Sequence, residues 1–130
     1  MSDINIDNKA YKKKILLTGG AGYIGSHVAV ALLESGFDIV IADNLSNSSE
    51  ESLSGIRKIT GRDFTFYNID VCDKSLLVDL FEREELDAVI HLAGYKAVGD
   101  AVKSPLKYYR NNITSTTSLL EVMDNYGVRK

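Results

Sequence analysis

The chain has 130 residues, of which 45% are hydrophobic and 25% are charged, and its formal net charge is −3 at pH 7. This composition is ordinary for a globular protein and excludes a disordered chain, and the acidic balance argues against a nucleic-acid surface or an anionic membrane as the main partner. Cys72 is the only cysteine, which excludes an intrachain disulfide and a cysteine-rich metal cluster and leaves Cys72 as a small packing residue.

The first eleven residues are polar, and we expect residues 1–11 to form a tail outside the folded domain. They lack the apolar segment of a secretion signal, and no later stretch is long enough to span a membrane. A cytoplasmic location is therefore expected. Residues 12–130 are expected to form one domain, which begins with three solvated lysines.

A glycine-rich turn follows the first expected strand, Ile15 to Leu17, and precedes an expected helix whose apolar residues recur at helical spacing from Ile24 to Leu32. Two registers of the dinucleotide-binding fingerprint fit this turn: Gly20-x-Gly22-x-x-Gly25 and Gly19-x-x-Gly22-x-x-Gly25. In such a turn one glycine makes the bend, one lets a pyrophosphate approach the backbone, and one lets the helix lie close on the strand. The helix N-terminus then faces the phosphates.

The second expected strand, residues 37–42, ends in Asp43, about 20 residues after the glycines, where a carboxylate binds the adenosine ribose of a dinucleotide. The same carboxylate would repel a 2′-phosphate, and no Arg or Lys lies between Asn44 and Ser49 to offset it. The pattern therefore favours NAD over NADP. The alternative is a purely structural turn followed by a helix-capping Asp.

Helices and strands are expected to continue in alternation. A helix from Leu53 to Ile59, a strand over 63–69, a helix over 76–81 capped by Asp73, and a strand over 88–93 come next, and a long helix from Pro105 to Gly127 follows. The apolar positions of the long helix are Tyr109, Ile113, Leu119, Leu120 and Met123. The fold class is α/β, a doubly wound parallel sheet of the Rossmann type with strand order 3-2-1-4 and a ligand crevice at the carboxyl ends of the strands.

Polar residues after three strands should line that crevice. Asp70 could bind the adenine amino group, the Gly94 backbone could pass close to the nicotinamide ribose or pyrophosphate, and Lys96 could add positive charge near the phosphates. The alternatives are a helix cap for Asp70 and a surface lysine for Lys96. One of Asn111 and Asn112 should face the crevice, because asparagine is a poor residue inside a helix. The two histidines, His27 and His91, are expected to be structural, and neither belongs to a metal-ligand spacing.

From Ile15 onward the sequence resembles the UDP-glucose 4-epimerase family of the extended short-chain dehydrogenase/reductases. The resemblance rests on the glycine turn from Thr18 to His27, the stretch from Asp43 to Ser48, Asp70-Val71, and the more discriminating stretch from His91 to Asp100 with its continuation from Pro105 to Asn112. It implies that NAD contacts Tyr23, Ile24, Asp43, Asn44, Leu45, Ser46, Asn47, Ser48, Asp70, Val71, Leu92, Ala93, Gly94, Tyr95, Lys96 and Asn111.

The resemblance also implies an activity, the interconversion of UDP-galactose and UDP-glucose, in which tightly held NAD transiently oxidises C4 of the hexose. Members of the family are commonly homodimers, and their catalytic base is the tyrosine of a Tyr-x-x-x-Lys motif, helped by a Ser or Thr. The spacing of Tyr126 and Lys130 matches that motif, but Gly127 should end the helix, so the two side chains would not share a helical face.

We therefore expect this chain to be the N-terminal portion of an epimerase, inactive alone, with its catalytic residues, remaining strands and nucleotide-sugar domain lying beyond it. A non-catalytic dinucleotide-binding module is the alternative from another class. A related nucleotide-sugar dehydratase or decarboxylase is a third, which the stretch from Lys96 to Asn112 disfavours. The outer edge of the strand over 88–93 is expected to be open to pairing.

Overall fold

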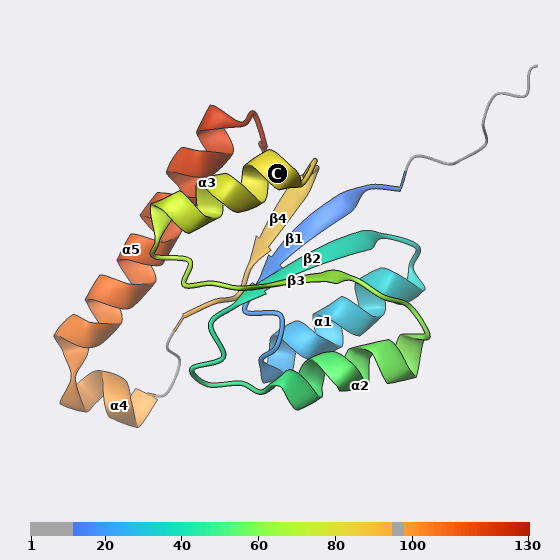
Figure 1. Ribbon diagram of the computed structural model, residues 1–130. Helices are drawn as coiled ribbons and strands as arrows, with labels where there is room; N and C mark the ends of the chain where they lie inside the picture. The colour runs from blue at the N-terminus through green and yellow to red at the C-terminus, as the bar shows by residue number, and fades with distance from the viewer. Residues whose placement is uncertain (1–11, 95–97) are drawn as a thin grey trace, which may run out of the picture.

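A computed structural model describes residues 12–94 and 98–130 of the chain, in which strands and helices alternate (Figure 1). The elements are, in order, β1 (Lys14–Thr18), α1 (Tyr23–Glu34), β2 (Asp38–Asp43), α2 (Glu50–Thr60), β3 (Thr65–Asn68), α3 (Lys74–Arg83), β4 (Ala88–His91), α4 (Val98–Lys103) and α5 (Pro105–Asn125). The expected tail, residues 1–11, lies outside the described residues.

The strands form one parallel sheet in the order β3-β2-β1-β4. The central strand β1 pairs with β2, where Lys14 lies opposite Asp38, and with β4, where Thr18 lies opposite His91. The predicted Rossmann-type α/β sheet and its strand order are confirmed. Since all four strands are parallel, their carboxyl ends lie at the same edge of the sheet. The last residues of the strands are Thr18, Asp43, Asn68 and His91.

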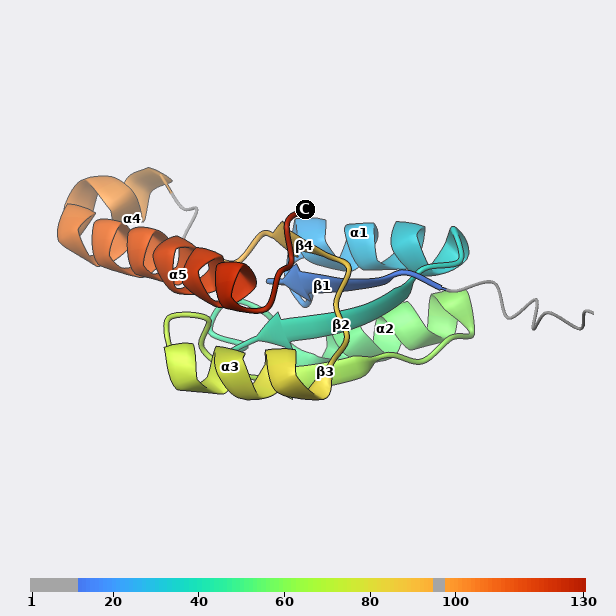
Figure 2. The same ribbon diagram turned by 90° about the horizontal axis from the view of Figure 1, so that it is seen from above.

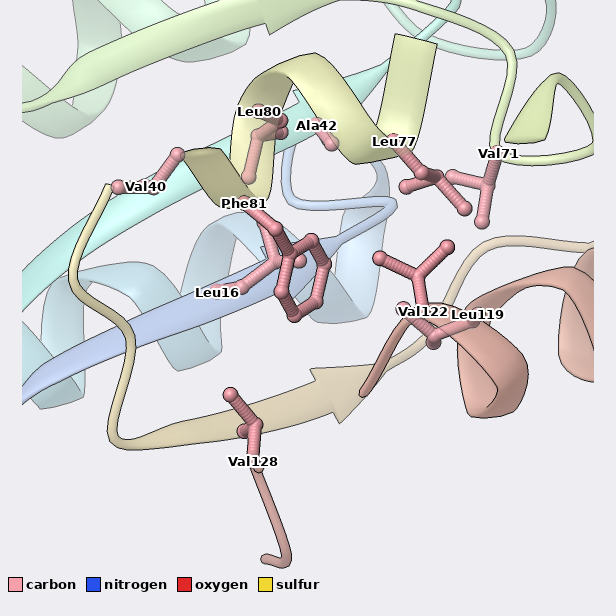
Figure 3. Packing of buried hydrophobic residues seen from close by; sticks show 10 residues of the cluster. All are labelled: Leu16, Val40, Ala42, Val71, Leu77, Leu80, Phe81, Leu119, Val122 and Val128. Carbon is pink, nitrogen blue, oxygen red and sulfur yellow. The ribbon is translucent and has the colours of Figure 1, made fainter. Parts of the chain in front are cut away.

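Helices α1 and α2 cover one face of this sheet and α3 and α5 cover the other (Figures 1 and 2). Alternate residues of β2 divide between the faces: Ile39 and Ile41 pack with residues of α1 and α2, whereas Val40 and Ala42 pack with residues of α3 and α5. Figure 3 shows the second of these clusters, which includes Phe81 of α3 and Leu119 of α5. Strands that are apolar on both faces are typical of a parallel sheet covered by helices.

The structure differs from the sequence-based expectations in three places. A short helix, α4, precedes the long helix and was not expected from the sequence. The strand β3 covers Thr65–Asn68, which is shorter than the expected range of 63–69. The apolar positions that predicted the long helix divide in the structure: Leu119 is buried and Met123 packs against the core cluster, but Tyr109, Ile113 and Leu120 are 67%, 52% and 57% exposed. Ser115 and Ser118 are among the buried residues of α5.

The outer edge of β4 is not wholly open. Val89 N–H donates a 2.9 Å hydrogen bond to the backbone oxygen of Lys130, so the segment after α5 returns to the sheet beside β4. Val128 in this segment is buried in the core cluster (Figure 3). The return of the chain partly covers the edge that the sequence predicted to be open to pairing.

Candidate functional site

A crevice of about 440 Å³ lies where the strands end, as expected for an open parallel sheet. Its volume falls within the range of small-molecule sites. The residues that line it come from the turn after β1, the start of α1, the end of β2, the loops after β2, β3 and β4, and from α4 and α5. They are Gly19, Gly22, Tyr23, Ile24, Asp43, Asn44, Ser46, Asn47, Ser48, Ile69, Asp70, Val71, Leu92, Ala93, Gly94, Asp100, Lys107, Tyr108, Asn111 and Ser115.

The glycine turn is built for close backbone packing at Gly19 and Gly25. Gly19 has a left-handed φ of 71°, and a Cβ placed on it would lie 2.7 Å from the Ala93 nitrogen. A Cβ on Gly25 would overlap the carbonyl oxygen of Gly19. Gly25 therefore lets α1 approach the turn, although it does not line the crevice itself. A Cβ on Gly20 would also be too close, at 2.8 Å from Ile41 Cγ2, so the first glycine of each register is in tight contact.

The N-terminus of α1 opens into the crevice without a side-chain cap. Gly22 is the N-cap residue and has no side chain to offer, and the first turn of the helix carries no acidic residue. The N–H groups of a first helical turn have no partner within the helix, so those of Tyr23 and Ile24 are available to an anion at this position. The arrangement is the usual one for binding phosphate groups.

Asp43 joins the turn after β1 to the loop after β2. The residue is only 8% exposed. Its Oδ2 accepts a hydrogen bond from the Ala21 N–H at 3.1 Å. Its Oδ1 accepts hydrogen bonds from the Leu45 N–H at 2.8 Å and from the Ser48 hydroxyl at 3.0 Å. A carboxylate offers about four acceptor positions. Three are in use, and the fourth, on Oδ2, leaves room for one hydroxyl of a bound molecule.

The loop after β2 presents hydroxyl and amide side chains to the crevice, from Asn44, Ser46, Asn47 and Ser48. Leu45 behaves differently: it does not line the crevice, and its side chain packs against the core cluster beneath α1 and α2. Leu45 also has a positive φ of 60°, which is unusual for a residue with a Cβ. The hydrogen bond from its N–H to Asp43 helps to hold this conformation.

Asp70 and Asp73 have separate places in the loop after β3. Asp73 is the N-cap of α3, and hydrogen bonds from the Ser75 hydroxyl and from the N–H groups of Leu76 and Ser75 lower its pKa. Asp70 lines the crevice beside Val71, and its Oδ1 accepts the Cys72 N–H at 2.8 Å. The structure thus gives the capping role to Asp73 and leaves Asp70 at the crevice.

Cys72 is a half-buried thiol next to α5. Its Sγ lies 3.4 Å from the backbone oxygen of Asn111. Burial, with a smaller contribution from the charge of Asp70, raises the pKa of this thiol to about 11. Cys72 therefore stays protonated at neutral pH, as befits the packing role expected from the sequence.

The far wall of the crevice is formed by Leu92, Ala93 and Gly94 and by one face of α5. Asn111 lines the crevice. Asn112 lies beside Gly94: a Cβ placed on Gly94 would be 3.0 Å from the Asn112 Oδ1. Sequence reasoning missed five lining residues: Ile69, Asp100, Lys107, Tyr108 and Ser115. A signal was available for two of them, because Lys107 and Ser115 flank Asn111 at intervals of four along the helix.

Two predicted site residues fall outside the described residues, and two residues that were not expected to act at the site do not line the crevice. Tyr95 and Lys96 fall outside the described residues. Tyr126 is not at the crevice: its hydroxyl donates to Glu82 Oε1 at 2.9 Å, and desolvation together with Glu82 raises its pKa, the opposite of what a catalytic base requires. His27 donates from Nδ1 to the Tyr23 carbonyl oxygen on the exposed side of α1, in keeping with a structural role.

Within residues 12–94 and 98–130, no group of three or more His, Cys, Asp or Glu side chains is arranged to hold a metal ion. Nor does any helix in the described part of the chain have the length and apolarity needed to cross a membrane.

Residues 15–130 match the family described as the NAD dependent epimerase/dehydratase family. The chain is 57% identical to the UDP-glucose 4-epimerase of Bacillus subtilis over 116 residues, which are 89% of this chain and 34% of that protein. It is 51% identical over 115 residues to UDP-glucose 4-epimerase uge1 of Schizosaccharomyces pombe, covering 88% of this chain and 32% of that protein. The chain thus spans about a third of the length of these relatives.

Among solved structures, the fold is similar to UDP-glucose 4-epimerase from Bifidobacterium longum in complex with NAD+ and UDP. The TM-score is 0.89 and the identity 43%, and the similarity covers 90% of this chain and 35% of that one. A second similar structure is UDP-glucose 4-epimerase from Brucella ovis in complex with NAD, with a TM-score of 0.80 and 37% identity over 90% of this chain and 34% of the other.

Proposed function

The chain belongs to the NAD dependent epimerase/dehydratase family, and from this premise we propose that it is the NAD-binding portion of a UDP-glucose 4-epimerase. The observation that carries the proposal is the meeting of the glycine turn with Asp43 at one crevice, through the hydrogen bond from Ala21 N–H to Asp43 Oδ2. A dinucleotide needs both groups together: an uncapped helix N-terminus for its pyrophosphate and a carboxylate for its adenosine ribose.

The described residues fit NAD at each part of the molecule. The uncapped start of α1 at Gly22 would bind the pyrophosphate, and Asp43 Oδ2 would accept a ribose hydroxyl. Asp70 would accept from the adenine amino group, and Leu92 to Gly94 would lie against the nicotinamide half. When bound, NAD supplies reversible hydride transfer.

Asp43 also supports NAD over NADP as the cofactor. A 2′-phosphate would come next to a carboxylate that is already held in place by three hydrogen bonds. The side chains around it at the crevice, Asn44, Ser46, Asn47 and Ser48, carry no positive charge that could offset the repulsion.

We propose further that the longer protein interconverts UDP-galactose and UDP-glucose in galactose metabolism, as a cytoplasmic homodimer, and that this chain alone does not catalyse the reaction. The described residues support the last point, because the only Tyr-x-x-x-Lys spacing starts at Tyr126, whose hydroxyl is bound to Glu82 away from the crevice. The exposed apolar side chains of α5, Tyr109 and Ile113 among them, support contact with a partner helix.

A chimeric enzyme tests the proposal. Residues 15–130 of this chain would replace the matching 116 residues of the Bacillus subtilis UDP-glucose 4-epimerase, to which they are 57% identical. We expect the chimera to convert UDP-galactose to UDP-glucose with NAD bound, and the same chimera carrying Gly19→Ala to lose that activity. A folded chimera that binds NAD but does not epimerise would favour the non-catalytic module, whereas one that cannot bind NAD would contradict the cofactor assignment.

A further inference from the structure

Three side chains behind the crevice wall, none of which lines the crevice, form one chain of hydrogen bonds between three elements. Thr18 ends β1, His91 ends β4, and Thr116 lies on α5. Thr18 Oγ1 is 2.6 Å from His91 Nδ1, and Thr116 Oγ1 is 3.3 Å from His91 Nε2. The imidazole of His91 therefore bridges the central strand of the sheet to the long helix.

The hydrogen bonds of Thr18 determine the direction of the first link. Thr18 is completely buried, and its Oγ1 accepts the Ala93 N–H at 3.2 Å and the Leu92 N–H at 3.0 Å; the Leu92 N–H is shared with the Thr18 backbone oxygen, also at 3.0 Å. A hydroxyl oxygen has two acceptor positions and one proton to donate. Since both acceptor positions are taken, the Thr18 proton must be donated to His91 Nδ1, and this nitrogen must be unprotonated.

In the second hydrogen bond, between His91 and Thr116, His91 is the donor. Thr116 Oγ1 donates its proton to the backbone oxygen of Asn112 at 2.8 Å, so it can only accept from His91 Nε2. The proton of the imidazole therefore resides on Nε2. The two neighbours of His91 together select the neutral Nε2–H tautomer.

The residues bound by this series of hydrogen bonds form part of the crevice wall. Leu92 and Ala93, whose N–H groups are bound by Thr18, both line the crevice. Asn112, which binds Thr116, also lies beside Gly94, the next residue of the wall. The hydrogen-bonded series Thr18–His91–Thr116 therefore contacts the segment from Leu92 to Gly94 at both of its ends, through Thr18 at one and through Asn112 at the other.

We propose that His91 is a positioning residue, which orients the Thr18 hydroxyl and thereby fixes the wall of the crevice against which the nicotinamide half of NAD lies. The proposal rests on the proposed function for the identity of the ligand. His91 does not line the crevice, and it acts through the acceptor on Nδ1 and the donor on Nε2.

The test compares two variants of the chain. His91→Leu removes both ring nitrogens, whereas His91→Asn keeps an amide oxygen near the position of Nδ1 and so keeps an acceptor for Thr18. We expect His91→Leu to speed hydrogen exchange of the Ala93 amide and to raise the Kd for NAD+ by about tenfold each, the effect of one lost buried hydrogen bond. For His91→Asn we expect both quantities within about threefold of the unmodified chain.

The tautomer is read directly from ¹⁵N NMR of the ligand-free chain, in which His27→Gln removes the other histidine signal. An unprotonated Nδ1 with a protonated Nε2 supports the proposal. A protonated Nδ1 would overturn it, and so would equal losses of NAD+ affinity in two variants that remain folded, or no loss in His91→Leu. If the unmodified chain does not bind NAD+, the proposed function fails, while the tautomer and the Ala93 exchange rate still decide the role of His91.

Discussion

Gly19 and Ala93 meet backbone to backbone: a Cβ on Gly19 would come within 2.7 Å of the Ala93 nitrogen. The turn after β1 and the segment after β4 are 74 residues apart in the chain, counting from Gly19 to Ala93, yet they touch with no side chain between them. Both residues line the crevice, so this contact joins the glycine turn to the wall that Thr18 and His91 hold in place.

Gly19→Ala should therefore destabilise the protein and abolish NAD+ binding. The new methyl group adds an overlap with Ala93 to the strain of a left-handed φ of 71°, and together these should cost more than about 2 kcal/mol. Gly61→Ala is the matched control, because Gly61 has a similar φ of 64° but nothing within 4 Å of its Cβ position, and should cost about 1 kcal/mol. Urea unfolding measures both, and equal losses would show that the contact with Ala93 is unimportant.

Asp43→Asn should weaken NAD+ binding by about 1–3 kcal/mol, because the substitution replaces an acceptor oxygen with an amide that cannot accept from both Ala21 and a ribose hydroxyl. Binding of NADP+ should fall less or improve, since the repulsion of the 2′-phosphate is removed. Calorimetric titration with both cofactors measures the ratio. Ser48→Ala, which removes one hydrogen bond to Asp43 and keeps its charge, should leave the preference for NAD+ in place. An unchanged cofactor ratio in Asp43→Asn would remove Asp43 from the ribose site.

The cap of α3 gives a pH-dependent prediction. The hydrogen bonds that Asp73 accepts from Ser75 and Leu76 lower its pKa below the ordinary value of 3.8, so the cap stabilises the fold above that pH and loses its contribution as the pH falls through the lowered pKa. Asp73→Ala should lower the urea midpoint more at pH 7 than at pH 2. Ser49→Ala is the control at the corresponding position of α2, where Ser49 makes no side-chain capping hydrogen bond, and should change the midpoint little at either pH. A similar loss in both variants would contradict the capping role.

Cys72 should react slowly with iodoacetamide. The pKa of its thiol is about 11 in the fold against an ordinary 9.0, so at pH 8 the thiolate fraction should be about a hundredfold lower than in the urea-unfolded chain. Removing the nearby charge in Asp70→Asn should lower the pKa and speed the reaction, because Asp70 contributes to the raised value. Alkylation of the folded chain at the unfolded rate would show that Cys72 is exposed in solution.

The sequence predicted the sheet well, because the information was local. Continuous apolar runs such as Ile39 to Ala42 identify strands covered on both faces, and right-handed crossovers between them allow few strand orders. The glycine turn and Asp43 were predicted for the same reason, since their mechanical roles depend on position in the chain and not on distant contacts.

The long helix shows where such reasoning fails. Tyr109 and Ile113 have the apolar character of core residues but lie exposed, while Ser115 and Ser118 are buried. Hydrophobicity alone therefore does not identify the buried face of this helix. The same difficulty hid Lys107 and Tyr108, which reach the crevice only because α5 lies along its wall.

The hydrogen bond between Thr18 and His91 was also out of reach of the sequence. Thr18 was assigned to the glycine turn, and His91 was expected to be a structural residue within its strand. Its two neighbours come from β1 and α5, and only their assembly shows which ring nitrogen must carry the proton.

The most direct test of the account is a calorimetric titration of the purified 130-residue chain with NAD+ and, separately, with NADP+, after checking that the chain is folded and carries no nucleotide. We predict binding of one NAD+ per chain and clearly weaker binding of NADP+. A folded chain that binds neither, or that prefers NADP+, would contradict the assignment of the crevice to NAD.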